Sequence, residues 1–383
     1  MLDLYRLAGL LPDFAAHHAQ TRQRSEGLMD AAFAALAGCH DCWEAFQSRA
    51  ETPDRSWLVA RLREAPAARA EPVPRPTPVT VVATDGSQVF PDRHREPHLY
   101  LLNVARLAFQ YGTAEAPFIE AVPHLGYDET SMKDLLDEVQ HDASDEAISA
   151  LRDHLELKAL LETAQDARVE GRPVVALADG TLIRWMLRAM RDGKLADQFV
   201  QKYAELLEGF REAGIPVASY ISLPRNTEVV NLLRLFREEP EEPGEDSLHG
   251  LLDRTLFERL LLPGERSAIF ESSSKILAQY GGADRICYFY VHVPCTPGEV
   301  GRVELPRWVA DDPGLVDLIH AVVLSECDKG RGYPMILAEA HERAVIRARE
   351  KEQFFHLVEH AVYGPGRPAP TSQKAASKRA PQG

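Results

Sequence analysis

Hydrophobic and polar positions follow two alternating patterns along most of the chain. Short apolar runs rich in β-branched and aromatic residues predict strands. These runs span 79–85, 98–112, 173–179, 215–222, 285–293 and 301–308. Apolar positions with helical spacing predict helices between and after them. The helices span 147–168, 180–213, 226–239, 313–330 and 333–362. Strands that alternate with helices in this way are typical of an α/β fold with a mixed sheet.

The two ends of the chain differ from this central pattern. Residues 1–66 are rich in alanine and leucine and predict a helical N-terminal region. Residues 67–78 are rich in proline and alanine, as in a linker. We therefore expect one globular domain over 79–363, followed by a low-complexity, disordered tail over 364–383.

Charge and cysteine content narrow the function classes. The chain has 383 residues and a net charge of −15, which argues against a protein that coats nucleic acid non-specifically. An enzyme whose basic residues line one channel is compatible with that charge. Five cysteines are too few for a disulfide scaffold, so we expect a protein of the reducing cytoplasm. No apolar run approaches the roughly 20 residues of a membrane span, and we expect no membrane association.

Two of the predicted strands end in the same short motif. Asp85-Gly86-Ser87 follows the run at 79–83, and Asp179-Gly180-Thr181 follows the run at 173–178. Ligands of open α/β sheets bind at the carboxyl ends of strands, and carboxylate oxygens suit Mg²⁺ or Mn²⁺. The alternative is that each Asp-Gly is an ordinary turn whose aspartate caps the next helix.

A third carboxylate is expected from the helix at 147–168. Glu156 and Glu162 are six positions apart, about 600° of rotation, so they cannot share one helix face. Glu156 is preferred because it lies among Leu155, Leu157 and Leu160, near the predicted buried face. The alternative for either residue is a solvated helix charge.

Tyr333 and His341 lie on the last predicted helix, with Tyr333 at its start. Eight positions correspond to about 800° of rotation, so both side chains can lie on adjoining faces. We expect His341 to serve as a metal ligand or a proton carrier. A buried histidine with a purely structural role is the alternative.

A run of basic residues follows the second Asp-Gly motif. Arg184, Arg188, Arg191 and Lys194 are spaced by four, three and three positions, which predicts one basic stripe along a helix. Beside a metal site, such a stripe would follow the phosphate backbone of a nucleic acid. The alternative is a solvated helix face.

Taken in order, seven segments resemble the NurA nuclease family. They are ATDGSQ (83–88), LRDHLELKAL (151–160), ALADGTLIRW (176–185), YISLPRNTEVVNLLR (220–234), ICYFYVHV (286–293), GRVELPRW (301–308) and YPMILAEAHERAVI (333–346). The resemblance implies an RNase H-like (Piwi-like) core, a mixed β-sheet flanked by helices, with residues 1–66 as a helical extension.

The resemblance also implies a function. The family members are metal-dependent DNA nucleases, with 5′-3′ exonuclease activity on single- and double-stranded DNA and endonuclease activity on single-stranded DNA. A cofactor of two Mn²⁺ or Mg²⁺ ions is implied. So are a homodimer and a HerA-type hexameric ATPase as partner in the end resection of double-strand break repair.

Family residues are carried over by motif. Asp85 and Asp179 match the metal-binding aspartates, Glu156 matches the helix glutamate better than Glu162, and Tyr333 and His341 match a tyrosine–histidine pair. The acidic segments 127–146 and 238–247 depart from the family pattern, and we expect them on the surface. Two other functions stay open, namely a catalytically inactive clamp or adaptor for a DNA-translocating motor and an RNase H-like nuclease that acts on RNA.

Overall fold

The computed structural model describes residues 2–50, 56–92, 97–127, 144–239, 244 and 247–364. The predicted disordered tail and most of the two acidic segments lie outside the described residues. Eleven strands of the described residues form one sheet, in the order β1-β9-β10-β11-β7-β6-β3-β4-β5, with β2 and β8 beside this path. Their bounds are β1 Arg61–Leu62, β2 Arg69–Ala70, β3 Val79–Val89, β4 Tyr100–Tyr111, β5 Phe118–Gly126, β6 Val174–Asp179, β7 Val217–Ile221, β8 Arg266–Ser267, β9 Phe270–Glu271, β10 Ile286–Val293 and β11 Glu299–Pro306.

Helices precede, interrupt and follow these strands. The α-helices are α1 Leu4–Asp41, α2 Trp43–Ala50, α3 Asp145–Asp166, α4 Gly193–Ala213, α5 Glu228–Phe236, α6 Asp253–Leu260, α7 Arg307–Ala310, α8 Pro313–Lys329, α9 Met335–Ala344 and α10 Ala348–Tyr363. Three short 3₁₀ helices are η2 Trp185–Ala189, η3 Lys275–Gln279 and η4 Gly282–Asp284. The fold is therefore mixed α/β, as the hydrophobic pattern predicted.

The centre of the sheet is parallel and its flanks are antiparallel. β3 pairs with β6 and β6 with β7 in parallel, whereas β3–β4, β4–β5 and β10–β11 are antiparallel. A continuous apolar run such as Val174-Val175-Ala176-Leu177 suits β6, because a parallel strand is covered on both faces.

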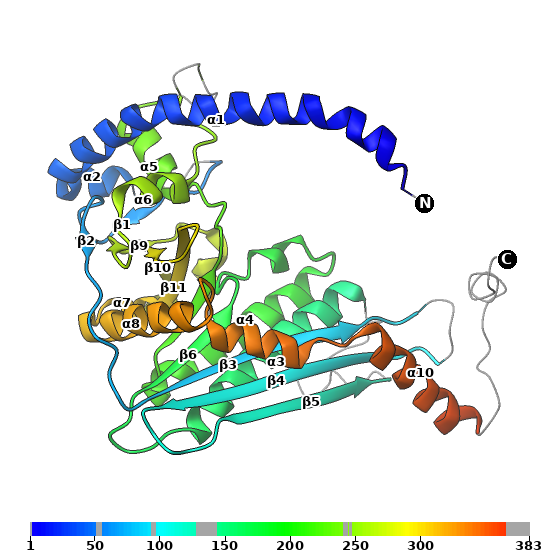
Figure 1. Ribbon diagram of the computed structural model, residues 1–383. Coiled ribbons are helices and arrows are strands. Elements are labelled where there is room, and N and C mark those ends of the chain that lie inside the picture. Colours follow the sequence, from blue (N-terminus) through cyan, green and yellow to red (C-terminus); the bar gives the residue numbers. More distant parts are fainter. Residues whose placement is uncertain are drawn as a thin grey trace.

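Two helical layers cover the two faces of these central strands. Val82 and Ala176 pack with residues of α3 and α4 in one hydrophobic cluster. Val81, Ala83 and Leu177 point to the other face and pack with α8 and α9. A third cluster joins α1, α2, α5 and α6 to the strands β9 and β10. Figure 1 shows α1 passing over α5 and α6 and continuing away from the body toward the N-terminus.

Several elements differ from the sequence prediction. The predicted helix over 180–213 is a turn, then η2, then α4, which begins after the N-cap Asp192. The predicted helix over 333–362 is broken at 345–347 into α9 and α10. The strand β5 and the helix α6 were not predicted, and neither were the short strands β1 and β2, which extend the sheet into residues 61–70.

Candidate active site

Asp85 and Asp179 lie on two neighbouring strands at the centre of the sheet. β3 and β6 pair in parallel register up to Ala83 and Leu177. Each aspartate lies two residues beyond the last paired residue of its strand, so both side chains point to the same face of the sheet as Ala83 and Leu177. Burial, and to a smaller degree the charge of Asp85, raises the pKa of Asp179. The recurrence of Asp-Gly in the sequence thus corresponds to two adjacent carboxylates.

The two Asp-Gly motifs differ in backbone structure, and one prediction about them is wrong. Asp179 ends β6, and Gly180 turns the chain with φ +76°, as expected. Asp85 is not at a strand end, because β3 continues to Val89 and pairs with β4 along its whole length. Only its pairing with β6 stops at Ala83. Asp85 therefore sits where β3 separates from β6 but stays paired with β4.

Gly86 brings helix α3 beside Asp85. A Cβ atom at position 86 would lie 2.5 Å from Glu156 Oε1 and 2.9 Å from Arg152 Cγ. Thr84 Oγ1 donates a hydrogen bond to the carbonyl oxygen of Glu156 at 2.9 Å, which fixes the helix against the strand. The glycine is needed for this close approach and not for a turn.

Glu156, and not Glu162, is the glutamate that reaches the site. Its Oε1 lies 3.0 Å from Arg152 Nε, and its side chain is 19% exposed. Burial raises the pKa of Glu156 to about 8, while Arg152 opposes this shift and Asp85 adds to it. Glu162 is 48% exposed on another face of α3, as the helical rotation predicted. The sequence analysis missed Arg152, although its i,i+4 spacing to Glu156 is visible in the sequence.

Tyr333 and His341 each contact one of the two aspartates. Tyr333 Oη donates a hydrogen bond to Asp179 Oδ1 at 2.7 Å. His341 Nδ1 lies 2.9 Å from Asp85 Oδ2, and Asp85 Oδ1 accepts from the Gly86 backbone N–H at 2.8 Å. The His341 side chain is 63% exposed, which excludes the alternative of a buried structural histidine. Tyr333 lies just before α9, and His341 lies on α9. This helix packs against β3.

The hydroxyl residues of the two motifs hold the site in place. Thr181 Oγ1 donates a hydrogen bond to Glu304 Oε2 at 2.8 Å, and the Leu182 backbone N–H donates to the same oxygen at 2.9 Å. Ser87 Oγ donates to the carbonyl oxygen of Ala344, at the end of α9. The hydroxyls thus connect the aspartate-bearing strands to β11 and α9.

Glu304 belongs to a buried chain of charges that the sequence analysis missed. Its Oε1 lies 2.9 Å from Arg302 Nε, and Arg302 Nη1 lies 3.0 Å from Glu228 Oε1. All three residues are buried. A charge inside the apolar strand sequence VGRVELP was the available signal, because buried charges are kept only when paired.

The predicted basic stripe does not form, and its first residue is not a nucleic-acid contact. Arg184 is buried, its Nη1 lies 3.4 Å from Asp153 Oδ2, and its guanidinium stacks on the Tyr203 ring at 4.7 Å. The predicted spacing requires one continuous α-helix. Instead, the 3₁₀ helix η2 is followed by the non-helical residues 190–192, and α4 begins only after them. Arg188, Arg191 and Lys194 are exposed but do not share one helix.

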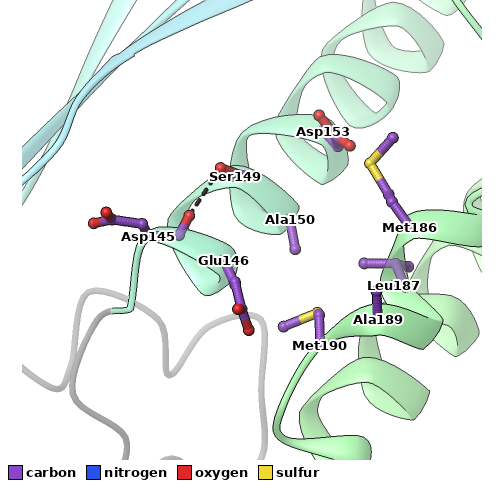
Figure 2. A pocket seen from close by; sticks show the side chains of 9 residues that line it. All are labelled: Asp145, Glu146, Ser149, Ala150, Asp153, Met186, Leu187, Ala189 and Met190. Carbon is purple, nitrogen blue, oxygen red and sulfur yellow. Dashed lines mark hydrogen bonds between the residues drawn. The ribbon is translucent and has the colours of Figure 1, made fainter.

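A pocket of about 340 Å³ adjoins the acidic residues. Figure 2 shows it between the start of α3 and the η2 segment. Its lining is Asp145, Glu146, Ser149, Ala150, Asp153, Met186, Leu187, Ala189 and Met190. Asp153 Oδ1 also accepts a hydrogen bond at 2.8 Å from Arg152, the partner of Glu156. Arg152 therefore connects Asp153, which lines the pocket, to Glu156.

The donor set fits a hard divalent cation. Asp85, Glu156 and Asp179 offer the carboxylate oxygens that Mg²⁺ and Mn²⁺ prefer. In the described part of the chain, Asp179 Oδ1 accepts a hydrogen bond from Tyr333, and Glu156 Oε1 pairs with Arg152. Within the same part of the chain, no three His, Cys, Asp or Glu side chains are arranged so that they could hold a metal ion as they stand.

The fold is that of a mixed α/β protein whose central sheet is covered by helices on both faces. The family model described as "NurA domain" matches residues 79–346, which is more than half of the chain. The chain therefore belongs to the NurA family.

One solved structure agrees with this fold over most of its length, and two others overlap with it in part. The NurA nuclease from Sulfolobus solfataricus is 17% identical and has a TM-score of 0.51, over 77% of this chain and 87% of that chain. LC9-RNase H1, a type 1 RNase H, is 17% identical with a TM-score of 0.20, over 38% of this chain and 62% of its own. The C-terminal lobe of a budding yeast Argonaute is 12% identical with a TM-score of 0.30, over 74% and 49%. The last two are partial overlaps and add nothing to the family assignment.

Two further searches had negative results. No match was found among the curated proteins. No helix in the described part of the chain combines the length and the apolar character needed to span a membrane.

Proposed function

We propose that this protein is a metal-dependent deoxyribonuclease that hydrolyses phosphodiester bonds. The observation that carries the proposal is the parallel pairing of β3 and β6 just before Asp85 and Asp179, together with the effect of the Asp85 charge, which helps to raise the pKa of Asp179. Glu156, Tyr333 and His341 then complete an acidic site with a proton-carrying group. Membership of the NurA family and the fold shared with a NurA nuclease support the same function.

In this proposal Asp85, Asp179 and Glu156 would hold two Mn²⁺ or Mg²⁺ ions. When bound, such ions lower the pKa of a water molecule and neutralise charge on the phosphate. Cation binding also removes the repulsion by which Asp85 helps to raise the pKa values of Glu156 and Asp179.

The chain's own residues position the reacting groups. Tyr333 holds the Asp179 carboxylate through its 2.7 Å hydrogen bond. His341 is oriented by Asp85 through Nδ1, which leaves its exposed Nε2 to accept or return a proton at the attacking water or the leaving 3′ oxygen. Arg188, Arg191 and Lys194 steer the DNA strand, whereas Arg184 keeps a structural role.

We further propose the finer activity of the family for this chain. It acts as a 5′-3′ exonuclease on single- and double-stranded DNA and as an endonuclease on single-stranded DNA, in end resection during double-strand break repair. It works in the cytoplasm as a homodimer with a HerA-type hexameric ATPase. Family membership supports these statements, and the exposed apolar side chains of α1 support association with a partner surface.

The test is a cleavage assay on DNA and RNA of one sequence, labelled at the 5′ or the 3′ end. Each substrate is incubated with Mn²⁺, Mg²⁺ or excess chelator, with and without the ATPase. We expect DNA cleavage from the 5′ end that requires a divalent ion. Cleavage in excess chelator would refute the metal, and cleavage of RNA alone would refute the substrate. No cleavage under any condition would favour an inactive clamp or adaptor.

A further inference from the structure

Four arginines gather around a cavity at the opposite side of the sheet from β5. The cavity has a volume of about 440 Å³. Its lining consists of Gln47, Arg61, Leu62, Arg63, Glu271, Arg285 and Arg307. A protein with a net charge of −15 thus concentrates positive charge at one place.

The arginines come from three places in the chain that the sheet brings together. Arg61 lies on β1 opposite Glu271 on β9. Arg63 follows two positions later, so both side chains leave the strand on the same side. Arg285 precedes β10, Arg307 follows β11, and the Arg307 backbone N–H donates to the Arg285 carbonyl at 2.7 Å. Arg61 and Arg63 precede the NurA domain match at 79–346, so the N-terminal region completes the cavity.

The positive charge exceeds what the acidic residues of the cavity balance. The buried Glu271 carboxylate lies 3.2, 3.6, 2.8 and 3.8 Å from the guanidinium groups of Arg61, Arg63, Arg285 and Arg307. Asp311 pairs with Arg63 and Arg307. Four cations therefore face two carboxylates, which leaves two formal positive charges.

The arginines of the cavity also have more N–H donors than the nearby carboxylates can accept. Each guanidinium carries five N–H donors, more than two carboxylates accept from four of them. Arg61 Nε is buried and has no hydrogen-bond partner in the described part of the chain. A planar fork of N–H donors matches the oxygens of a phosphate group in pairs.

We propose that this cavity, lined by Arg61, Arg63, Arg285 and Arg307, binds a phosphate group. The group is either a backbone phosphodiester of a DNA strand or a free phosphate compound. From β6 to β9 the sheet order crosses four strand spacings, so the cavity lies on the order of 20 Å from Asp179. About six nucleotide steps of 3.4 Å span that distance. Only the DNA source rests on the proposed nuclease function.

The test measures binding by the full chain in excess chelator, so that cleavage plays no part. Pyrophosphate binding is followed by calorimetry, and binding of a fluorescent single-stranded DNA is followed by anisotropy. We expect Arg61→Gln and Arg285→Gln to weaken binding at least fivefold. Glu271→Gln should tighten it at least threefold, because it removes the competing anion. The matched control is Arg211→Gln, an exposed arginine paired with Glu208, which should change binding less than twofold.

The two probes separate the two sources of phosphate. If the cavity variants weaken DNA binding and pyrophosphate competes with DNA, the ligand is the strand. If they weaken only pyrophosphate binding, the ligand is a free phosphate compound. If neither probe distinguishes the cavity variants from Arg211→Gln, the proposal is overturned.

A second measurement needs no variant and covers the case in which one fails to fold. Phenylglyoxal modifies accessible arginines, and peptide mass spectrometry locates them. Pyrophosphate should protect the four cavity arginines at least threefold and leave Arg211 unprotected. Equal modification with and without pyrophosphate would overturn the proposal, whatever the result of the cleavage assay.

Discussion

Gly86 is the residue at which side chains from the two faces of the sheet meet. Asp85 faces α9, where His341 contacts it, while Glu156 approaches from α3 on the other face. β3 lies between the carboxylates of Asp85 and Glu156. Glu156 comes close to β3 at position 86 because glycine has no Cβ atom there. Convergence of three acidic groups therefore depends on one absent Cβ atom.

We predict that Gly86→Ala abolishes most of the nuclease activity. The new Cβ would lie 2.5 Å from Glu156 Oε1, so the glutamate must move away from Asp85. Cleavage should fall at least 100-fold, and the free energy of unfolding should fall by about 1–3 kcal/mol, as for overpacking. Cleavage rates and urea unfolding measure the two effects.

The control for this substitution is Gly193→Ala, where nothing lies within 4 Å of the added Cβ atom. It should leave both quantities unchanged within about 0.5 kcal/mol. Equal activity of the two variants would show that Glu156 does not need its present position.

Candidate site residues could be predicted from the sequence where a motif repeats along the chain. They could not be predicted where the role of a residue depends on a partner that is distant in the sequence. The repeated Asp-Gly motif pointed to Asp85 and Asp179, and apolar neighbours pointed to Glu156. Arg184 was assigned to a nucleic-acid surface because a sequence shows its charge but not its burial. Its partner Asp153 lies 31 positions away, and only the packing of α3 beside η2 brings the two together.

At the scale of elements, β11 holds the end of β6 through the buried charges Arg302 and Glu304. The Glu304 carboxylate accepts two hydrogen bonds from the turn that follows Asp179. A buried carboxylate with complete partners fixes its surroundings, whereas one that loses a partner is costly. The orientation of Asp179 therefore depends on a strand that carries no catalytic residue.

We predict that Thr181→Val lowers activity without preventing folding. The valine keeps the shape of threonine but leaves Glu304 Oε2 with only the Leu182 N–H donor. Cleavage should fall about tenfold and the free energy of unfolding by about 1–2 kcal/mol. Thr181→Ser keeps the hydroxyl and should remain within twofold of the wild type in activity. If valine and serine behave alike, the hydroxyl has no positioning role.

The helix α8 makes stability depend on pH. His320 is fully buried on α8, and its Nε2 lies 2.9 Å from the Gly264 carbonyl oxygen. Burial lowers the pKa of His320 from 6.5 to about 4, and the Gly264 hydrogen bond opposes this shift. The unfolded chain takes up the proton first, so the stability from the neutral ring is present above pH 6.5 and is lost as pH falls toward 4.

We therefore predict a smaller pH dependence for His320→Gln than for the wild type. Between pH 6.5 and 4, the free energy of unfolding should fall by at most about 3 kcal/mol because of this histidine. Urea unfolding at several pH values measures it as a difference between the two proteins, because other groups that titrate are shared. Parallel stability curves would contradict the assignment of a neutral buried ring.

Element type could be predicted wherever burial imposes a period. The buried strands β6, β7 and β10 and the helices α3 and α8 follow their apolar patterns. β5 was missed because it is an edge strand with mostly exposed residues, so burial imposes no pattern on it. The break between α9 and α10 was missed because no glycine or proline marks it.

At the scale of the whole molecule, α1 presents apolar side chains to solvent. Residues 2–24 are all exposed, and Leu4, Leu7, Leu11 and Phe14 fall within about 80° of one helix face. A stripe of this kind is typical of an association surface. The sequence alone predicted the helix but not that its first half leaves the body.

We predict that the proposed homodimer forms through this stripe. Leu7→Asp/Leu11→Asp places two charges on the stripe and should convert a dimer to a monomer, with unchanged secondary structure. Light scattering after size-exclusion chromatography gives the mass. The control is Ala16→Asp/Gln20→Asp, which also adds two charges to the exposed part of α1 but on the opposite face of the helix. A wild-type monomer, or a stripe variant that stays dimeric, would contradict the prediction.

The most direct measurement is the DNA cleavage rate of Asp85→Asn with saturating Mn²⁺. The substitution keeps the size and the Gly86 hydrogen-bond acceptor of the side chain but removes the charge beside Asp179. The account predicts a rate at least 1,000-fold below that of the wild type, at unchanged secondary structure and thermal unfolding. A folded Asp85→Asn protein that cleaves DNA at the wild-type rate would show that the paired aspartates are not the catalytic site.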